Sequence, residues 1–295
     1  MPLHLRPFDM VYPSTAQEAV EMRDAYPSSC YLSGGTHLIP QWRASQRPPD
    51  LVINLKRIQH WVRPEEVDGL WIDPATTVAD LRVCQPVGSQ LAALHMALTE
   101  FGSPLIEPLA TITGNLAAAR PEGTLAVSMI ALGATIFYDS VTGSGVVAAD
   151  DLFEKPGQTT LPHGALITGV QIPHPVSSAH SGHLAIRAGL ATSTPVVAAS
   201  AVIEFSADGR VLGGRLSVAH ATPTPREVRT AREIMQLGLP VSEVVDVLGD
   251  AAVAAIEPDD DWWASARYRQ RMTRVVTERL IRSVAAKADT SGGLT

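Results

Sequence analysis

The fold of this chain is decided by the stretch CYLSGGTH at residues 30–37. Its apolar start and its two adjacent glycines are typical of a strand that runs into a glycine turn. Upstream, Ser14 and Thr15 each stand three residues before a Gln or Glu, the capping-box pattern of a helix start, and Pro27 predicts the end of that helix. A second strand is expected at residues 51–55. Helix, strand, glycine loop and strand together predict a small α/β unit.

The glycine turn is a candidate phosphate site. Gly34 and Gly35 can adopt positive φ, so that successive backbone N–H groups point at one ligand. Such a nest of N–H groups suits an anion, and the hydroxyl of Thr36 would add a donor. The alternative is an ordinary turn between a strand and a loop, and this motif alone does not decide between the two.

A second candidate loop is TITGN at residues 111–115. Its residues are small or hydroxylated, and the segment around it is poor in charge, which suits the close approach of a nucleotide. The alternative is that Gly114 and Asn115 only shape a tight turn.

The rest of the sequence predicts a mixture of helix and sheet. A helix is expected at residues 90–101, and a buried helix at 127–134 leads to a strand at 135–138. Residues 166–173 alternate like a strand, and the pattern changes near residue 174. An antiparallel strand pair and three helices are then expected, at residues 196–205, 211–220, 225–237, 241–255 and 265–287.

Length and charge bound the function. At roughly 100–200 residues per domain, 295 residues predict two or three domains. Because phosphate backbones need a concentrated basic surface, a net charge of -7 argues against nucleic acid as a partner. The opening residues Met1–Arg6 have no apolar core before a cleavage site, and no apolar run approaches about 18 residues, so we expect a cytoplasmic protein with no membrane partner.

No familiar metal or hydrolase motif is present. Cys30 and Cys84 fit no metal-ligand spacing, and two cysteines are too few for the four that hold an iron–sulfur cluster. The histidines of the Pro- and Ser-rich segment at residues 174–183 are interpreted as surface residues. Asp259–Asp261 is interpreted as an exposed acidic helix start. We therefore expect no metal site, and we identify no catalytic acid or base.

Taken in order, the motifs resemble the FAD-binding (medium) subunits of molybdenum hydroxylases, the xanthine dehydrogenase and carbon monoxide dehydrogenase family. Residues 33–40 and 49–55 (SGGTHLIP and PDLVINL) are similar to the first flavin signature of the family, and residues 108–115 are similar to the second. Further similar segments follow in the family's order over almost the whole chain, at residues 132–134, 166–173, 221–225 and 268–269.

The resemblance implies an α+β architecture. A two-subdomain FAD-binding fold of the PCMH/VAO type would occupy residues 1–56 and 57–173, and a C-terminal α+β domain like that of the carbon monoxide dehydrogenase flavoprotein would occupy residues 174–295. The residues that it places at the FAD are Ser33, Gly34, Gly35, Thr36 and His37 around the pyrophosphate, Leu38 beside it, Thr111, Gly114 and Asn115 at the phosphates and ribityl chain, and Leu166 near the isoalloxazine.

Three departures from the family pattern stand out. Thr113 replaces the first glycine of the family's Gly-Gly-Asn, and a β-branched residue resists positive φ, so a reshaped loop is expected. Thr124 stands where the family usually has an Asp that contacts the cofactor, and we keep Thr124 as a cofactor-binding residue. The family's Arg-Arg…Asp stretch reads RAGLATST here, residues 187–194, with one arginine and no acid.

The implied function is that of an FAD-dependent oxidoreductase subunit. Electrons would pass from [2Fe–2S] clusters through FAD to an external acceptor. An iron–sulfur small subunit and a molybdopterin large subunit would be separate partner chains, in a heterotrimer or a dimer of heterotrimers. Two alternatives stay open: a stand-alone flavin-dependent oxidoreductase with His37 as a candidate proton donor or acceptor, and a non-catalytic member that has lost FAD.

Overall fold

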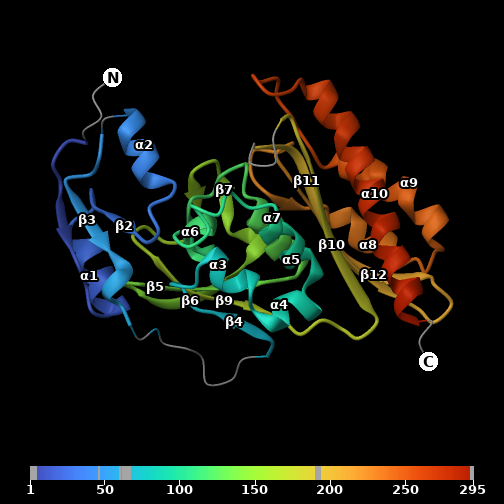
Figure 1. Ribbon diagram of the computed structural model, residues 1–295, viewed down its shortest axis with the longest axis horizontal. Coiled ribbons are helices and arrows are strands. Elements are labelled where there is room, and N and C mark those ends of the chain that lie inside the picture. Colours follow the sequence, from blue (N-terminus) through green and yellow to red (C-terminus); the bar gives the residue numbers. More distant parts are fainter. Residues whose placement is uncertain (1–4, 46, 60, 62–67, 190–193, 293–295) are drawn as a thin grey trace.

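The structure is a computed structural model that describes residues 5–45, 47–59, 61, 68–189 and 194–292. Two segments used in the sequence analysis lie outside this set. They are residues 1–4, part of the basis for the predicted location, and residues 190–193, within the stretch that departs from the family pattern. Three sheets follow one another along the chain and across the molecule, from the blue N-terminal end to the red C-terminal helices (Figure 1). No helix in the described part of the chain has the length and apolar character of a membrane span.

The first sheet is small and parallel, in the order β1-β3-β2. Its strands are β1 (Asp9–Val11), β2 (Cys30–Leu32) and β3 (Leu51–Asn54), with helices α1 (Ala16–Ala25) and α2 (Leu38–Ser45). Thr15 is the N-cap of α1, and its hydroxyl accepts the Glu18 N–H at 3.1 Å, while the carboxylate of Glu18 accepts the Ser14 N–H at 2.6 Å. The predicted helix, strands and glycine turn are therefore confirmed.

The second sheet is antiparallel, in the order β4-β9-β5-β6. Its strands are β4 (Leu70–Ile72), β5 (Thr135–Ser140), β6 (Gly143–Ala148) and β9 (Leu166–Ile172). A short hairpin, β7 (Phe153–Lys155) and β8 (Gln158–Thr159), lies beside it. The helices of this part are α3 (Val78–Arg82), α4 (Gln85–Gln90), α5 (Ala92–Thr99), α6 (Ile112–Ala117) and α7 (Thr124–Ala131).

Two helix predictions for this part are confirmed, with shifted ends. All eight residues of α7 are buried, as its small apolar sequence predicts. The helix expected at residues 90–101 is confirmed as α5, which starts at Ala92 because Leu91 leaves the helical region (φ -115°, ψ 59°) and separates α5 from α4. The side chain of Leu91 is buried, as predicted for the apolar face of the helix.

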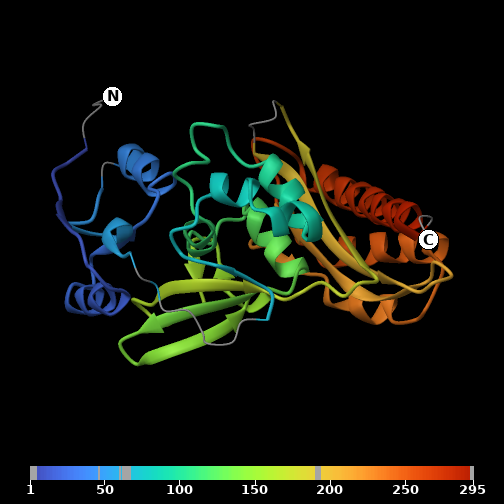
Figure 2. The same cartoon turned by 60° about the horizontal axis from the view of Figure 1, so that its bottom comes forward.

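The third sheet is antiparallel, in the order β10-β11-β12-β13. Its strands are β10 (Ala179–Arg187), β11 (Pro195–Phe205), β12 (Val211–Ala219) and β13 (Arg226–Glu227). Helices α8 (Arg229–Met235), α9 (Val241–Ala254) and α10 (Ala266–Gly292) lie on one side, and α5 and α7 pack on the other (Figures 1 and 2). Because both faces are covered, β11 is a nearly continuous run of buried residues.

The interface between α5, α7 and the third sheet contains a buried polar network. The hydroxyls of Ser128 and Ser200 lie 3.0 Å apart, and Ser200 Oγ lies 2.8 Å from Nδ1 of His183. The prediction of surface histidines is therefore wrong for His183, which is wholly buried in β10. Burial lowers the pKa of His183 to about 3, and it lowers the pKa of His220, a buried residue with φ +70°, to about 3 as well. Both imidazoles are neutral in the folded chain at neutral pH.

Candidate functional site

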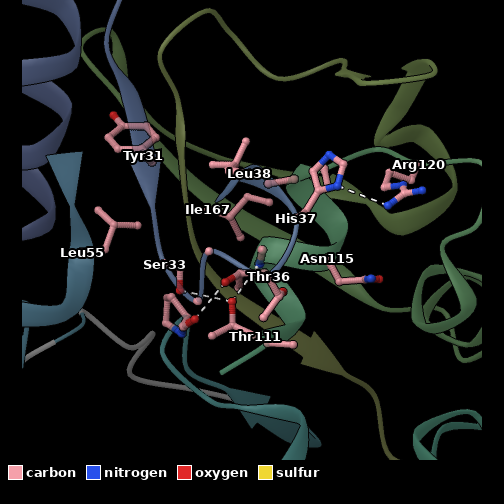
Figure 3. Close-up of a pocket in the computed structure, with 18 of the residues that line it drawn as sticks. Tyr31, Ser33, Thr36, His37, Leu38, Leu55, Thr111, Asn115, Arg120 and Ile167 are labelled. Carbon is pink, nitrogen blue, oxygen red and sulfur yellow. Dashed lines mark hydrogen bonds between the residues drawn. The ribbon is translucent and has the colours of Figure 1, made fainter. Parts of the chain in front are cut away.

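A cavity of about 1190 Å³ lies where the first two sheets meet. Its walls come from the β2–α2 turn, the start of α6, the loop at residues 157–167 and the ends of α5 and β10. The labelled side chains of Figure 3 point into this space from segments far apart in the sequence. Every predicted site residue lines the cavity: Ser33, Gly34, Gly35, Thr36, His37, Leu38, Thr111, Gly114, Asn115, Thr124 and Leu166.

The two candidate loops cross at the wall of the cavity. A Cβ atom on Gly34 would lie only 1.8 Å from the carbonyl oxygen of Leu109, so the two backbones touch where Gly34 has no side chain. The hydroxyls of Ser33 and Thr111 lie 3.2 Å apart across the same crossing (Figure 3). Only glycine permits this approach, which places polar groups of both loops at one point of the cavity wall.

The second loop is the first turn of a helix. Thr111 is the N-cap of α6, and its hydroxyl accepts the Gly114 N–H at 3.1 Å. Thr113 is buried inside α6, and its hydroxyl donates to the Pro74 carbonyl at 2.8 Å. Thr113 therefore needs no positive φ in this chain: a helical residue has negative φ, which a β-branched side chain tolerates. Oδ1 of Asn115 is buried without a hydrogen-bond partner among the described residues.

The first loop has the backbone that its glycines predict. Gly35 has φ +71°, a conformation that side-chain-bearing residues rarely adopt, and α2 starts three residues later at Leu38. Nδ1 of His37 accepts a hydrogen bond from the Arg120 guanidinium at 3.2 Å (Figure 3). Burial, followed by the charge of Arg120, lowers the pKa of His37. Arg120 also pairs with Glu122 at 3.0 Å, so the loop after α6 contacts the β2–α2 turn at this edge.

Thr124 and Leu166 form other parts of the cavity wall. Thr124 is the buried first residue of α7. Leu166, the buried first residue of β9, packs with the core of the first sheet around Ala19 and Ile53. Ile167, the next residue, belongs to the core of the second sheet and also lines the cavity. The start of β9 thus joins the two sheets at the cavity.

The sequence did not reveal several other cavity residues. The hydroxyl of Tyr31 donates to the Gly164 carbonyl at 2.8 Å, and burial raises its pKa. Arg120 reaches the cavity from the loop after α6, and Glu100 and Arg187 meet there from α5 and β10. The contact between Glu100 and Arg187 could not be predicted from a local sequence motif, because 87 positions separate the two residues.

The site can bind a ligand that carries a phosphate. Hydroxyls and glycine backbone gather at the crossing, and apolar and aromatic side chains line much of the remaining wall. Four arginine and lysine side chains line the cavity against two carboxylates, so its charge balance favours an anionic ligand: Arg23, Lys56, Arg120 and Arg187 against Glu100 and Glu122. His37 adds little to this positive excess, because burial lowers its pKa.

Comparisons with known proteins agree over the whole length. Residues 6–175 match the family of the FAD binding domain in molybdopterin dehydrogenase, and residues 185–284 match the CO dehydrogenase flavoprotein C-terminal domain. The nicotine 6-hydroxylase medium subunit of Paenarthrobacter nicotinovorans is 26% identical, over 93% of this chain and 96% of its own length. The carbon monoxide dehydrogenase medium chain of Afipia carboxidovorans is 25% identical, over 95% of this chain and 98% of its own.

Solved structures show the same fold. A chain of the reconstituted CO dehydrogenase from Oligotropha carboxidovorans superposes with a TM-score of 0.91 at 23% identity, over 96% of this chain and 99% of that one. A chain of quinoline 2-oxidoreductase from Pseudomonas putida 86 gives a TM-score of 0.87 at 21% identity, over 97% and 99%. The predicted α+β fold class, an FAD-binding part followed by a C-terminal part of the carbon monoxide dehydrogenase type, is confirmed.

Proposed function

The chain belongs to the family of FAD-binding subunits of molybdenum hydroxylases, and from this premise we propose that it takes electrons from the iron–sulfur clusters of a partner chain and passes them through FAD to an external acceptor. The observation that carries this proposal is the crossing of the two loops. Gly34 lies against the backbone of Leu109, and the hydroxyls of Ser33 and Thr111 stand side by side in a large cavity. This arrangement fits the pyrophosphate of FAD.

We assign the cofactor contacts segment by segment. The backbone from Ser33 to His37 would hold the pyrophosphate, together with the hydroxyl of Thr111, and Gly114 would lie beside it. Oδ1 of Asn115 is buried and has no hydrogen-bond partner among the described residues, which supports a contact with a hydroxyl of the ribityl chain, because a buried acceptor without a partner is costly. Thr124 would take the place of the family's aspartate with a hydroxyl, and Leu38 and Leu166 would supply apolar walls.

FAD supplies the redox chemistry when it is bound, and the chain supplies binding, orientation and electrostatics. The glycine crossing fixes the position of the phosphates. Apolar walls, such as those of Leu166 and Ile167, exclude water from part of the cavity. The basic side chains that line it offset the charge of the phosphates. No acid–base step is assigned to any residue.

The partners would be two separate chains. Relatives of nearly the same length are named medium subunit or medium chain, which implies a small and a large subunit beside this one. We propose that the small subunit carries the [2Fe–2S] clusters and the large one molybdopterin, in a heterotrimer or a dimer of heterotrimers. Cys30 and Cys84 are free thiols, and burial raises the pKa of Cys30 to about 11, which disfavours the thiolate that a cluster needs.

Two further parts of the proposal rest on the sequence. We propose domain boundaries after residues 56 and 173, which leave each of the three sheets within one domain. A cytoplasmic location also remains a prediction.

Electron transfer within the native complex tests the proposed function. We expect the chain to purify with an iron–sulfur chain and a molybdenum chain, and the flavin absorbance to bleach when the substrate of the molybdenum chain is added without oxygen. The isolated, flavin-loaded chain should not bleach with the same substrate. Bleaching of the isolated chain would favour a stand-alone flavin oxidoreductase, and a flavin that stays oxidised in the intact complex would contradict the proposal.

A further inference from the structure

One end of the cavity contains an ion pair between two parts of the fold. Arg187, at the end of β10, donates to the backbone carbonyl of Glu100 at 2.7 Å, and to the Glu100 carboxylate at 3.4 Å. Both side chains line the cavity, and they are 14% and 30% exposed, so solvent screens this pair only in part. Phe101, Ile106 and Pro195 provide apolar walls beside them.

A buried histidine lies behind the carboxylate. Nε2 of His183 has no hydrogen-bond partner in the described part of the chain and lies 4.0 Å from Oε2 of Glu100, the same oxygen that faces Arg187. Burial keeps His183 neutral by lowering its pKa to about 3. The histidine therefore does not cancel the charge of Glu100, and the carboxylate lies between a cation at the cavity and a neutral ring in the core.

The two ends of the cavity differ in their charges. An extended ligand that is held by its phosphates at the crossing would place one ring at each end. At the far end, on the side of the first sheet and beside Gly164, the guanidinium of Arg23 donates to the backbone carbonyls of Tyr26 and Pro27 and has no ion pair among the described residues. The near end, where the guanidinium of Arg187 and the carboxylate of Glu100 lie side by side, suits the ring whose charge changes during the reaction.

We propose that Arg187 and Glu100 set the reduction potential of the bound flavin, with Arg187 favouring and Glu100 opposing the negative charge that reduction places at this end of the cavity. The inference rests on the proposed function, since it needs FAD in this cavity. In a partly buried site, a full charge still affects another charge several ångströms away. In bulk water the same interaction would be largely screened. Protein groups of this kind are a recognised means of adjusting a flavin.

The test is a spectroelectrochemical titration of the full chain loaded with FAD. Arg187→Gln should lower the equilibrium constant for two-electron reduction about tenfold, a midpoint about 30 mV more negative. Glu100→Gln should raise it about tenfold, a midpoint about 30 mV more positive. Arg187→Lys keeps the charge and should stay within about threefold of the wild type, and so should Arg23→Gln, the matched loss of a cation at the far end.

Opposite shifts from the two neutralising variants are the decisive result, because a merely structural role would not reverse its sign with the sign of the charge. If Arg187→Gln does not fold, Glu100→Gln and Arg187→Lys still decide the question. Flavin that binds with unchanged potentials in these variants, or with shifts of the same sign, overturns this inference and leaves the proposed function intact. A wild-type chain that takes up no FAD overturns both.

Discussion

Replacing Gly34 by alanine is expected to abolish stable FAD binding. The new Cβ would lie 1.8 Å from the carbonyl oxygen of Leu109, so the two loops must separate where they cross. The backbone N–H groups and the Ser33 and Thr111 hydroxyls would then no longer converge on one point. We expect the dissociation constant for FAD to rise about 100-fold or more, roughly 3 kcal/mol in binding free energy. Equilibrium titration of the flavin-free variant with FAD measures it.

Gly88→Ala is the matched control. Gly88 lies in α4, and a Cβ there would meet no atom within 4 Å, so the same substitution adds the same methyl group without a clash. FAD affinity should remain at the wild-type value, and circular dichroism should show both variants folded. A folded Gly34→Ala chain with wild-type affinity would remove the loop crossing from the cofactor site.

The second large effect is acid destabilisation by two buried histidines. Burial holds the folded-state pKa of both His183 and His220 near 3, against about 6.5 for an unfolded chain. The neutral rings therefore contribute stability that is fully present above about pH 6.5 and is lost as the pH falls from about 6.5 towards 3. Each histidine should cost about 2 kcal/mol of unfolding free energy between pH 7.5 and pH 5. Denaturant unfolding of the purified chain at these two pH values measures the sum.

A histidine that does not titrate should reduce this pH dependence. His220→Asn is suited to the test, because asparagine tolerates the φ of +70° at this position and its amide carries no charge. About half of the histidine contribution to the pH dependence should disappear in this variant. His174→Asn, at an exposed position between β9 and β10, should leave the dependence unchanged. An unchanged slope in His220→Asn would show that the residue does not carry the proton uptake.

The sequence predicted those elements whose signals are local. The cap at Thr15, the strand before Gly34 and the β11–β12 pair all depend on residues within a few positions of one another. β10 was missed because proline and serine precede it and because its histidines were taken for polar surface residues. In fact His183 is wholly buried, in a strand that α5 covers although it lies far away in the sequence. Burial of this kind depends on tertiary packing that no short window contains.

In the candidate site, too, the local features were predicted and the contacts between distant residues were not. Both loops were predicted, because glycine indicates an unusual backbone conformation and threonine a hydrogen-bonding turn. The structure of the second loop was not predicted correctly. Gly114 was taken as part of an irregular loop, whereas the Thr111 cap already starts α6 and makes Thr113 helical. The Glu100–Arg187 pair and the Arg120–His37 contact join residues 87 and 83 positions apart, and only the fold brings them together.

The most direct test of this account is a titration of the purified, flavin-free wild-type chain with FAD, followed by release of the bound flavin on denaturation. The account predicts saturable binding of one FAD per chain, with a flavin absorbance spectrum perturbed from that of free FAD. A folded chain that takes up no FAD from excess would contradict it. Electron transfer would then have no carrier in this subunit, and the fold would serve assembly or interaction alone.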